Sequence, residues 1–341
     1  MKIGFVSNFW GTARGHSYVS RELVNILKSA GHETHMYRIG DNQILTEFPE
    51  VTSLKTNPTI KISKEDFEKW LDEINPDYCM FNEYIQWWDE DHDKLEICKE
   101  RGIKTIGYLV WEKLDWDKIE HYKLYTKIIC PTVFQTKLLR QHGLYNSVHT
   151  PWGIDLTETE KITEPEKKDN KVIFYHCAGA GGVDNRKNTS AIIEAYKTIE
   201  DKNTDLMITH LNKKQFSRKE IFAFTKYADI VINVSKWDTI GLNTIESNAL
   251  GRPVIVANAP PMNELIKDRV NGFVVDGKFT KSPNVTCPSY EIDVVELAKK
   301  MTICKQKAIV DTLKNNSKKF AETNFDMNKN KKYILELFKE A

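Results

Sequence analysis

The sequence lacks an excess of charge of either sign. Its 341 residues contain 49 Lys and Arg against 48 Asp and Glu, so the formal net charge is only +1. The chain therefore has no overall basic field of the kind that attracts proteins to nucleic acid. We expect nucleic acid to be a disfavoured partner, although a local basic patch would be compatible with this total.

Long hydrophobic runs are also missing. No apolar stretch approaches the ~18 residues that a membrane-spanning helix needs. The N-terminal segment, MKIGFVSNFW, has one Lys and a short strand-like run, without the apolar core of about 7–15 residues that marks a signal peptide. The sequence therefore predicts a cytoplasmic protein without a membrane span.

Cysteine and histidine are scattered. The six Cys form no CxxC pair, and the nine His show no HExxH or other ligand spacing. Disulfide frameworks and zinc sites depend on such spacing. We expect buried free thiols, as in reducing compartments, and no metal site.

The sequence does contain enough apolar material for two domains. Hydrophobic residues make up 40% of the chain and aromatic residues 11%, which argues against disorder. At ~150 residues per domain, the length corresponds to about two domains.

Apolar runs typical of strands alternate with helical patterns along both halves of the chain. In the first half, strands are expected at 2–7, 32–37, 77–81, 104–110 and 127–130, and helices at 17–30, 63–74, 94–101 and 132–142. In the second half, strands are expected at 171–177, 206–210, 229–234 and 253–257, and helices at 189–199, 219–227 and 242–250, with further helices from about 291. The polar stretch between the halves, 157–170, is the best linker. This alternation predicts two doubly wound α/β domains with parallel sheets.

Ligands of such sheets bind beyond the carboxyl ends of the strands, so the loops there are the candidate sites. The first loop is 8–16 (NFWGTARGH). Gly11 and Gly15 would let backbone approach a ligand, Arg14 adds a positive charge, and the following helix start favours an anion. A plain strand-to-helix turn would have the same sequence.

A second glycine-rich loop follows the first strand of the second half, at 178–188 (AGAGGVDNRKN). Its glycines, among them Gly181 and Gly182, do not complete a GxGxxG fingerprint, and no GxxxxGK[ST] loop exists. Arg186 and Lys187 stand just before a helix that Asn188 or Thr189 can cap. Two cations and free N–H groups at a helix start suit a diphosphate. The alternative is a solvated loop with surface charges.

The most informative segment is 233–258 (NVSKWDTIGLNTIESNALGRPVIVAN). Asp238 lies in the loop after a strand, and Glu246 lies one turn or so inside the next helix, so both can face one site. Carboxylates there can accept hydrogen bonds from sugar hydroxyls, and the N–H groups of 241–243 can hold a phosphate. For an isolated acid pair, surface charge would be the ordinary interpretation, but the surrounding pattern argues against it.

This segment resembles the acid-x7-Glu signature of the retaining GT-B glycosyltransferases, and their large family four (glycosyl transferases group 1) is the nearest likeness. Further matches are an interdomain crossover at 131–143 and 148–155, a diphosphate loop at 186–188, and an x-E…NGF pattern at 263–264 and 271–275. The resemblance extends over most of the chain.

The resemblance implies a GT-B architecture, in which two facing Rossmann-like domains enclose a deep interdomain cleft. Residues 1–153 would form the acceptor-side domain and 154–322 the nucleotide-sugar-binding domain. The C-terminal helix, 323–341, would cross back to the first domain.

The resemblance also implies residue roles. Glu246 would bind the ribose hydroxyls of the donor, Asp238 the hydroxyls of the transferred sugar, and Lys187 and Arg186 the diphosphate. Backbone contacts to the donor would come from Gly11, Gly15, Gly181, Gly182, Gly241, Leu242 and Asn243. The first acid is usually Glu and here is Asp238, and Gly182 stands where an Arg is frequent, so Lys187 is the firmer of the two cation assignments.

Two features of the first half have competing interpretations. Many relatives carry a His after the strand at 104–110, whereas this chain has Glu112, which could orient the acceptor or cap a loop. The segment 87–91 (WWDED) holds a D-x-D match that could bind a metal, but a surface acid with sugar-stacking or packing Trp residues is favoured. Front-face retaining transfer needs neither a metal nor a protein base, because the leaving phosphate oxygen can take the acceptor proton.

We therefore expect a retaining, metal-independent hexosyl- or pentosyltransferase without a cofactor. Its donor would be a nucleotide sugar, with UDP-sugar favoured over GDP-sugar, and its acceptor a glycan, glycoconjugate or other hydroxyl compound. The alternatives are a sugar-nucleotide epimerase of the same fold, glycosylation of a modified DNA base, and a non-catalytic sugar-binding descendant. A Rossmann oxidoreductase is disfavoured because GxGxxG is absent.

Overall fold

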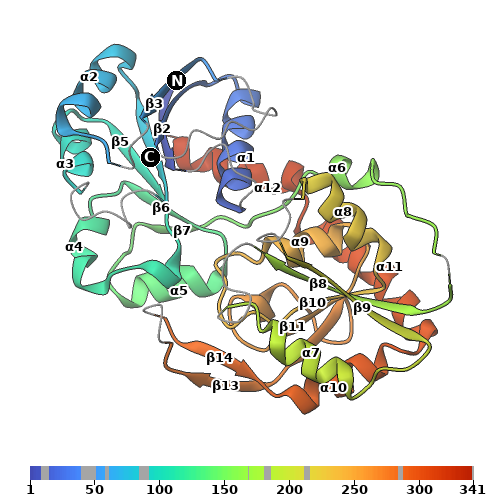
Figure 1. The fold of residues 1–341 in the computed structure, drawn as a ribbon. Coiled ribbons are helices and arrows are strands. Elements are labelled where there is room, and N and C mark those ends of the chain that lie inside the picture. Colours follow the sequence, from blue (N-terminus) through green and yellow to red (C-terminus); the bar gives the residue numbers. More distant parts are fainter. Residues whose placement is uncertain are drawn as a thin grey trace. The chain divides into compact units, whose positions relative to one another are not determined.

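The computed structural model of the chain describes residues 1–8, 15–39, 51–57, 61–83, 92–167, 169–179, 186–210, 216–282 and 287–339. The chain divides into two compact units (Figure 1). The first comprises Met1–Pro151 and Asn330–Ala341, and the second comprises Trp152–Lys329.

The described part of the first unit contains a seven-stranded sheet with the order β3-β2-β1-β4-β5-β6-β7, and all its neighbouring strands are parallel. The strands are β1 (Lys2–Asn8), β2 (Glu33–Ile39), β3 (Ser53–Asn57), β4 (Tyr78–Asn82), β5 (Lys104–Tyr108), β6 (Lys127–Cys130) and β7 (Ser147–His149). The strand order reverses between β1 and β4, which makes this pair the topological switch point.

Helices cover both faces of this sheet, with α1 on one face and α2 and α3 on the other (Figure 1). They are α1 (Gly15–Ser29), α2 (Lys64–Ile74), α3 (Asp93–Glu100), α4 (Ile119–Tyr122) and α5 (Val133–Gln141), with the short 3-10 turns η3 (Trp111–Lys113) and η4 (Trp116–Lys118). Right-handed crossovers explain this arrangement, because the chain leaves β1 in one direction and later returns past it in the other.

The described part of the second unit contains a five-stranded parallel sheet with the order β12-β11-β10-β8-β9 and an antiparallel β13-β14 hairpin. The strands are β8 (Val172–Gly179), β9 (Thr204–His210), β10 (Ile230–Asn233), β11 (Val254–Ala257), β12 (Gly272–Val275), β13 (Gly277–Thr280) and β14 (Ser289–Ile292). Here the order reverses between β8 and β10.

Helices α7 and α10 cover one face of the second sheet, and α8 and α9 cover the other (Figure 1). The helices of this unit are α6 (Leu156–Glu160), α7 (Thr189–Lys197), α8 (Arg218–Tyr227), α9 (Leu242–Ala249), α10 (Val294–Ile303) and α11 (Lys307–Asn324), with the 3-10 turn η5 (Met262–Glu264). Helix α12 (Met327–Leu335) spans the division between the units, and η6 (Glu336–Phe338) ends the described chain.

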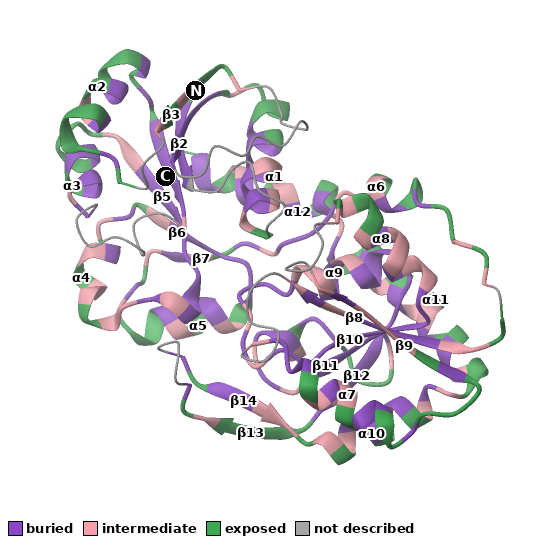
Figure 2. Ribbon diagram, viewed as in Figure 1, coloured by how far each residue is buried: buried purple, intermediate pink, exposed green. Residues whose placement is uncertain are grey.

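Burial explains why the central strands are continuous apolar runs. Every residue of β10 (IVIN) and β11 (VIVA) is buried, and Figure 2 shows the central strands of both parallel sheets as largely buried. A parallel sheet with helices on both faces has no solvent-facing side, so its strands do not alternate polar and apolar residues.

The linker expected at 157–170 is wrong in its first part. Asp155 caps α6 by accepting a hydrogen bond from the N–H of Thr157, and α6 extends to Glu160. The whole stretch lies within the second unit, which begins at Trp152. Polar composition alone misled the interpretation, because a short helix whose outer face is solvated has the same composition as a loop.

The C-terminal residues return to the first unit. Asn330–Ala341 belong to it, Phe338 packs edge-on against Tyr78 with 5.2 Å between ring centroids, and Lys127 Nζ donates to the carbonyl of Leu337 at 3.0 Å. The returning segment thus begins at 330, where the sequence predicted 323.

Candidate functional site

The candidate site lies at the switch point of the second sheet, beyond the carboxyl ends of β8 and β10. Arg186 and Lys187 follow β8, and Ser235 and Asp238 follow β10. Strands β8 and β10 are hydrogen-bonded neighbours, and the helices that follow them, α7 and α9, lie on opposite faces of the sheet. The two loops therefore diverge, and their backbone and side chains border a common space.

Lys187 is the central cation of this site. Its side chain is only 9% exposed. The Nζ donates to Asp238 Oδ2 at 3.2 Å and to Ser235 Oγ at 3.2 Å. Burial and the neighbouring Arg186 lower the pKa of Lys187, and Asp238 opposes them. An ammonium group has three N–H donors, so one remains for a ligand in this arrangement.

Asp238 is held by two cations. Besides Lys187, Arg186 Nη1 lies 3.6 Å from its Oδ1, and Oδ1 also accepts the N–H of Thr239 at 3.0 Å. Burial by itself would raise the pKa of Asp238, but Lys187 and Arg186 outweigh it and hold that pKa below its usual value. Asp238 is therefore an anionic hydrogen-bond acceptor at neutral pH.

A buried polar layer fixes the position of Lys187. Asn188, with a left-handed φ of 53°, donates from Nδ2 to the carbonyl of Val234 at 2.8 Å and so joins the two loops. Beneath it, His176 Nδ1 lies 2.9 Å from the carbonyl of Ile232 and Nε2 lies 2.9 Å from Thr189 Oγ1. Burial lowers the pKa of His176 to about 4, so this ring is neutral and structural.

The expected side-chain cap of α7 is not formed. Asn188 occupies the N-cap position, but its side chain points to the other loop and caps no helix N–H. The sequence could not show this, because Asn at a helix start is normally a cap.

Gly241 occupies the N-cap position just before α9 in a left-handed conformation, with φ 65°. A Cβ there would lie 2.7 Å from Leu265 Cδ1, so only glycine fits without a shift. No side chain caps α9. The N–H groups of Leu242 and Asn243, the first two residues of the helix, are thus placed at an uncapped helix start of the kind that binds anions.

Glu246 lies further along α9 and has a different partner. Arg218 Nη2 donates to its Oε1 at 3.1 Å, and Arg218 Nη1 lies 3.3 Å from Oε2 of Glu158. Sequence reasoning missed Arg218, which is 28 positions from Glu246 and belongs to no motif. The one available signal was its place at the start of a helix that follows a strand.

In the first unit, Glu112 lies in η3 after β5 and is 4% exposed. A residue that the sequence did not single out, Glu83, follows β4 at the switch point with a left-handed φ of 53°, and its N–H donates to the carbonyl of Tyr108 at 2.9 Å. Burial and the nearby Glu112 raise the pKa of Glu83 to about 8. Two carboxyl groups thus lie near each other at the carboxyl edge of this sheet.

Several expected residues lie outside the described part of the chain. They are Gly11, Arg14, Trp87, Trp88, Asp89, Asp91, Gly181 and Gly182. Gly15 is described as the first residue of α1 and is exposed.

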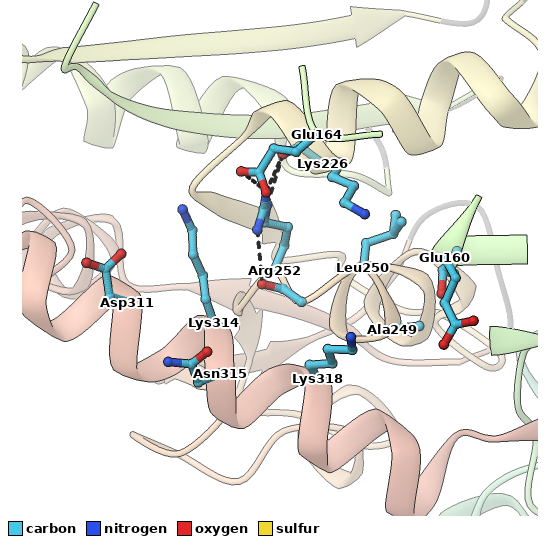
Figure 3. A pocket seen from close by; sticks show the side chains of 12 residues that line it. Glu160, Glu164, Lys226, Ala249, Leu250, Arg252, Asp311, Lys314, Asn315 and Lys318 are labelled. Carbon is cyan, nitrogen blue, oxygen red and sulfur yellow. Dashed lines mark hydrogen bonds and ion pairs between the residues drawn. The ribbon is translucent and has the colours of Figure 1, made fainter. Parts of the chain in front are cut away.

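A separate cavity of about 510 Å³ lies beside the amino end of β11 (Figure 3). Arg252 lies at its centre and forms an ion pair with Glu164, and its Nε donates to the carbonyl of Lys226 at 3.0 Å. Lys314 forms an ion pair with Asp229 at 2.6 Å. Since protein acceptors already hold these two cations, we assign this region to the stability of the unit.

Within the ranges that the structure describes, no three His, Cys, Asp or Glu side chains are grouped as metal ligands would be. No described helix combines the length and apolarity needed to cross a membrane.

Comparison with known proteins identifies the segment that contains Asp238 and Glu246. Residues 208–282 match the family model described as Glycosyl transferases group 1. Lys187 lies outside the match. None of the curated proteins matches the sequence.

Solved structures match over nearly the whole chain. A sucrose-phosphate synthase from Thermosynechococcus elongatus has a TM-score of 0.73 at 14% identity, covering 99% of this chain and 98% of its own. A glycosyltransferase from Rickettsia africae has a TM-score of 0.69 at 16% identity, covering 98% and 97%. The Anabaena protein HepE in complex with UDP-glucose has a TM-score of 0.71 at 15% identity, covering 99% of both chains.

These likenesses confirm the fold expected from the sequence, with two Rossmann-like domains of the GT-B type. The family match supports the resemblance to group 1 in residues 208–282 and indicates the expected class of enzyme, a glycosyltransferase.

Proposed function

We propose that this chain, a glycosyltransferase of the GT-B fold, moves a sugar from a nucleotide-sugar donor to an acceptor hydroxyl with retention of configuration. The observation that carries the proposal is the group of Lys187, Arg186 and Asp238 at the switch point of the second sheet. It combines cations for a diphosphate with an anionic acceptor for sugar hydroxyls.

In this proposal the donor diphosphate lies against Lys187, Arg186 and the uncapped start of α9. Lys187 uses its third N–H for a phosphate oxygen, and the helix N–H groups add further donors. Asp238 accepts hydrogen bonds from the transferred sugar, and Glu246 accepts them from the ribose. These groups stabilise the charge that develops on the leaving diphosphate.

The transfer step then needs no protein base. The bond between the anomeric carbon and the phosphate oxygen breaks while the acceptor oxygen bonds to the same face of that carbon. The acceptor proton passes to the departing phosphate oxygen, so the products are the glycosylated acceptor and the nucleoside diphosphate. Positioning and charge stabilisation supply the catalysis, and we expect activity to persist in EDTA.

UDP-sugar is the favoured donor, with GDP-sugar as the alternative. The support is the structural likeness to a protein that was solved with UDP-glucose. The acceptor is proposed to be a glycan or glycoconjugate, bound by the first unit near Glu112. At this edge Glu112 and Glu83 offer carboxyl groups to acceptor hydroxyls.

The test is calorimetric binding of UDP-, GDP-, ADP- and CMP-glucose to the wild-type chain and to Glu246→Ala, with Glu322→Ala, at an exposed position of α11, as the control. We expect one nucleotide sugar to bind the wild type and the control, and Glu246→Ala to lose binding while its circular dichroism is unchanged. If Glu246→Ala bound each nucleotide sugar with the same affinity as the wild type, the proposed donor site would be contradicted. Conversion of the donor without any acceptor would instead indicate an epimerase.

A further inference from the structure

Arg218 connects two carboxylates from different helices. Its guanidinium lies 3.1 Å from Glu246 Oε1 on α9 and 3.3 Å from Glu158 Oε2 on α6. The Arg218 Cζ also lies 4.9 Å from the ring centroid of Phe222, one turn further along α8. Phe222 is buried, so the guanidinium is held between an aromatic face and two anions.

The backbone at Arg218 is fixed as well. Ser217 caps α8, accepting the N–H of Glu220 at 3.2 Å, and Glu220 Oε2 accepts the N–H of Ser217 at 2.8 Å. This reciprocal capping box sets the direction in which the first helical residue leaves the backbone. Arg218 is that residue, so its position does not depend on Glu246 alone.

Arg218 favours the ionised form of Glu246. Burial raises the pKa of Glu246, the Arg218 guanidinium lowers it, and Glu158 raises it. Among the described residues, the titratable groups that influence Glu246 are Arg218 from α8, Glu158 from α6 and Tyr175 from β8. Arg218 is the only cation of this set, and without it a buried carboxylate would tend to take up a proton.

The contact also leaves half of the carboxylate available. Arg218 bonds to Oε1, and within the described residues no hydrogen bond to Oε2 of Glu246 is formed. A carboxylate oxygen has two lone pairs, which match the two hydroxyls of a ribose ring.

We propose that Arg218 is a positioning residue of the donor site: with Glu158 behind it, it fixes Glu246 so that Oε2 accepts hydrogen bonds from the ribose hydroxyls of the nucleotide. The inference rests on the proposed function. Arg218 touches neither the nucleotide nor the transferred sugar in this arrangement. Its effect is on donor affinity and on the discrimination between ribose and deoxyribose.

The experiment is calorimetric binding of UDP and of 2′-deoxy-UDP, with Arg218→Ala, Arg218→Lys and Glu158→Gln as variants. Arg269→Ala is the matched control, because Arg269 is 78% exposed in the same unit. We expect the wild type and the control to prefer UDP. Arg218→Ala should bind UDP about 10- to 100-fold more weakly, the range of a lost charged hydrogen bond, and should lose the preference for UDP. Glu158→Gln should show a smaller loss in the same direction.

The pH profile separates positioning from a general loss of structure. In Arg218→Ala the guanidinium no longer opposes the burial that raises the pKa of Glu246, so the preference for UDP should recover as the pH rises and Glu246 ionises. If Arg218→Ala fails to fold, Arg218→Lys serves instead, since Lys lacks the planar fork whose Nη1 and Nη2 reach Glu158 and Glu246 separately. If the folded variants keep the preference for UDP over 2′-deoxy-UDP, the role of Arg218 is overturned. If the wild type binds none of the nucleotide sugars used above, the proposed function itself is overturned.

Discussion

Asp238 and Glu246 are both carboxylates of the proposed donor site, yet their environments differ. Asp238 is held by Lys187 and Arg186, which lower its pKa, whereas burial raises the pKa of Glu246 against one guanidinium. In the sequence the two acids are only a pair of carboxylates eight positions apart. Only the folded chain shows that the two acids have different cationic partners, and this supports separate roles for them.

Lys187 gives the most direct test at the residue scale. Lys187→Ala removes the buried ammonium next to the proposed diphosphate, and we expect kcat to fall by about 10²- to 10³-fold, the effect of losing one preorganised charge-stabilising donor. Steady-state kinetics with the donor found by calorimetry would measure it. Lys319→Ala, at an exposed position of α11, is the control. Normal turnover of Lys187→Ala would place the diphosphate elsewhere.

Glu83 predicts a pH dependence of stability. Its pKa in the folded chain is about 8, above the ordinary ~4.3 of an unfolded Glu. The folded state therefore binds the proton more tightly, and the resulting stability is complete below about pH 4 and is lost as the pH rises through 8.

Glu83→Gln should remove this loss, because the amide does not titrate. Urea unfolding at pH 5 and pH 8.5 would measure the change in the free energy of unfolding of wild type and variant. Glu65→Gln, at an exposed position of α2, is the control. The wild type should lose more stability across this range than Glu83→Gln. The same loss in both proteins would show that Glu83 is ionised throughout.

At the scale of elements, the strands of the second sheet pack so closely that β12 must begin with glycine. A Cβ on Gly272 would lie 2.0 Å from the carbonyl oxygen of Val254 on β11. That oxygen belongs to a paired strand and cannot move without loss of hydrogen bonds. In the sequence the same glycine only formed part of an NGF pattern.

We expect Gly272→Ala to destabilise the second unit by about 3 kcal/mol, at the upper end for overpacking. Gly251→Ala is the matched control in the same unit. It has a left-handed φ of 70° but no atom closer than 3.8 Å to the added Cβ, so about 1 kcal/mol is expected. Chemical denaturation followed by circular dichroism would compare them, and equal losses would contradict the packing argument.

Elements were predicted well where apolar periodicity was strong. Strands such as β6 and β8 and helices such as α2 and α5 begin and end within two residues of the expected positions. The strands β3, β7 and β12 and the β13–β14 hairpin were not predicted. They are three to five residues long. Because β3 and β13 are largely exposed, they lack the buried apolar run on which the interpretation relied. The short apolar run of β12, GFVV, was assigned to a motif and not to a strand.

At the scale of the whole molecule, the division into two units predicts which unit a bound nucleotide protects from hydrogen exchange. A ligand that binds only the folded second unit stabilises it by RT ln(1 + [L]/Kd), or about 2.7 kcal/mol at 100 times Kd. Hydrogen exchange with and without saturating UDP should therefore slow mainly within Trp152–Lys329. The strongest effect is expected around α9 and the loop at Lys187. Protection confined to Met1–Pro151 would contradict the assignment of the donor to the second unit.

The sequence by itself determined the fold class and named the candidate residues of the second half, because strand–helix alternation and short motifs are local properties of the chain. Asp238, Glu246, Lys187 and Gly241 were all named from it.

Only the tertiary structure decided which groups meet. Lys187 reaches Asp238 across 51 positions and Arg218 reaches Glu246 across 28, and Glu83 lies near Glu112 because β4 and β5 are paired. Such contacts depend on strand order and helix packing, and no local pattern encodes them. The charge state of each buried group follows from those contacts, so it too was fixed by the fold and not by the motif.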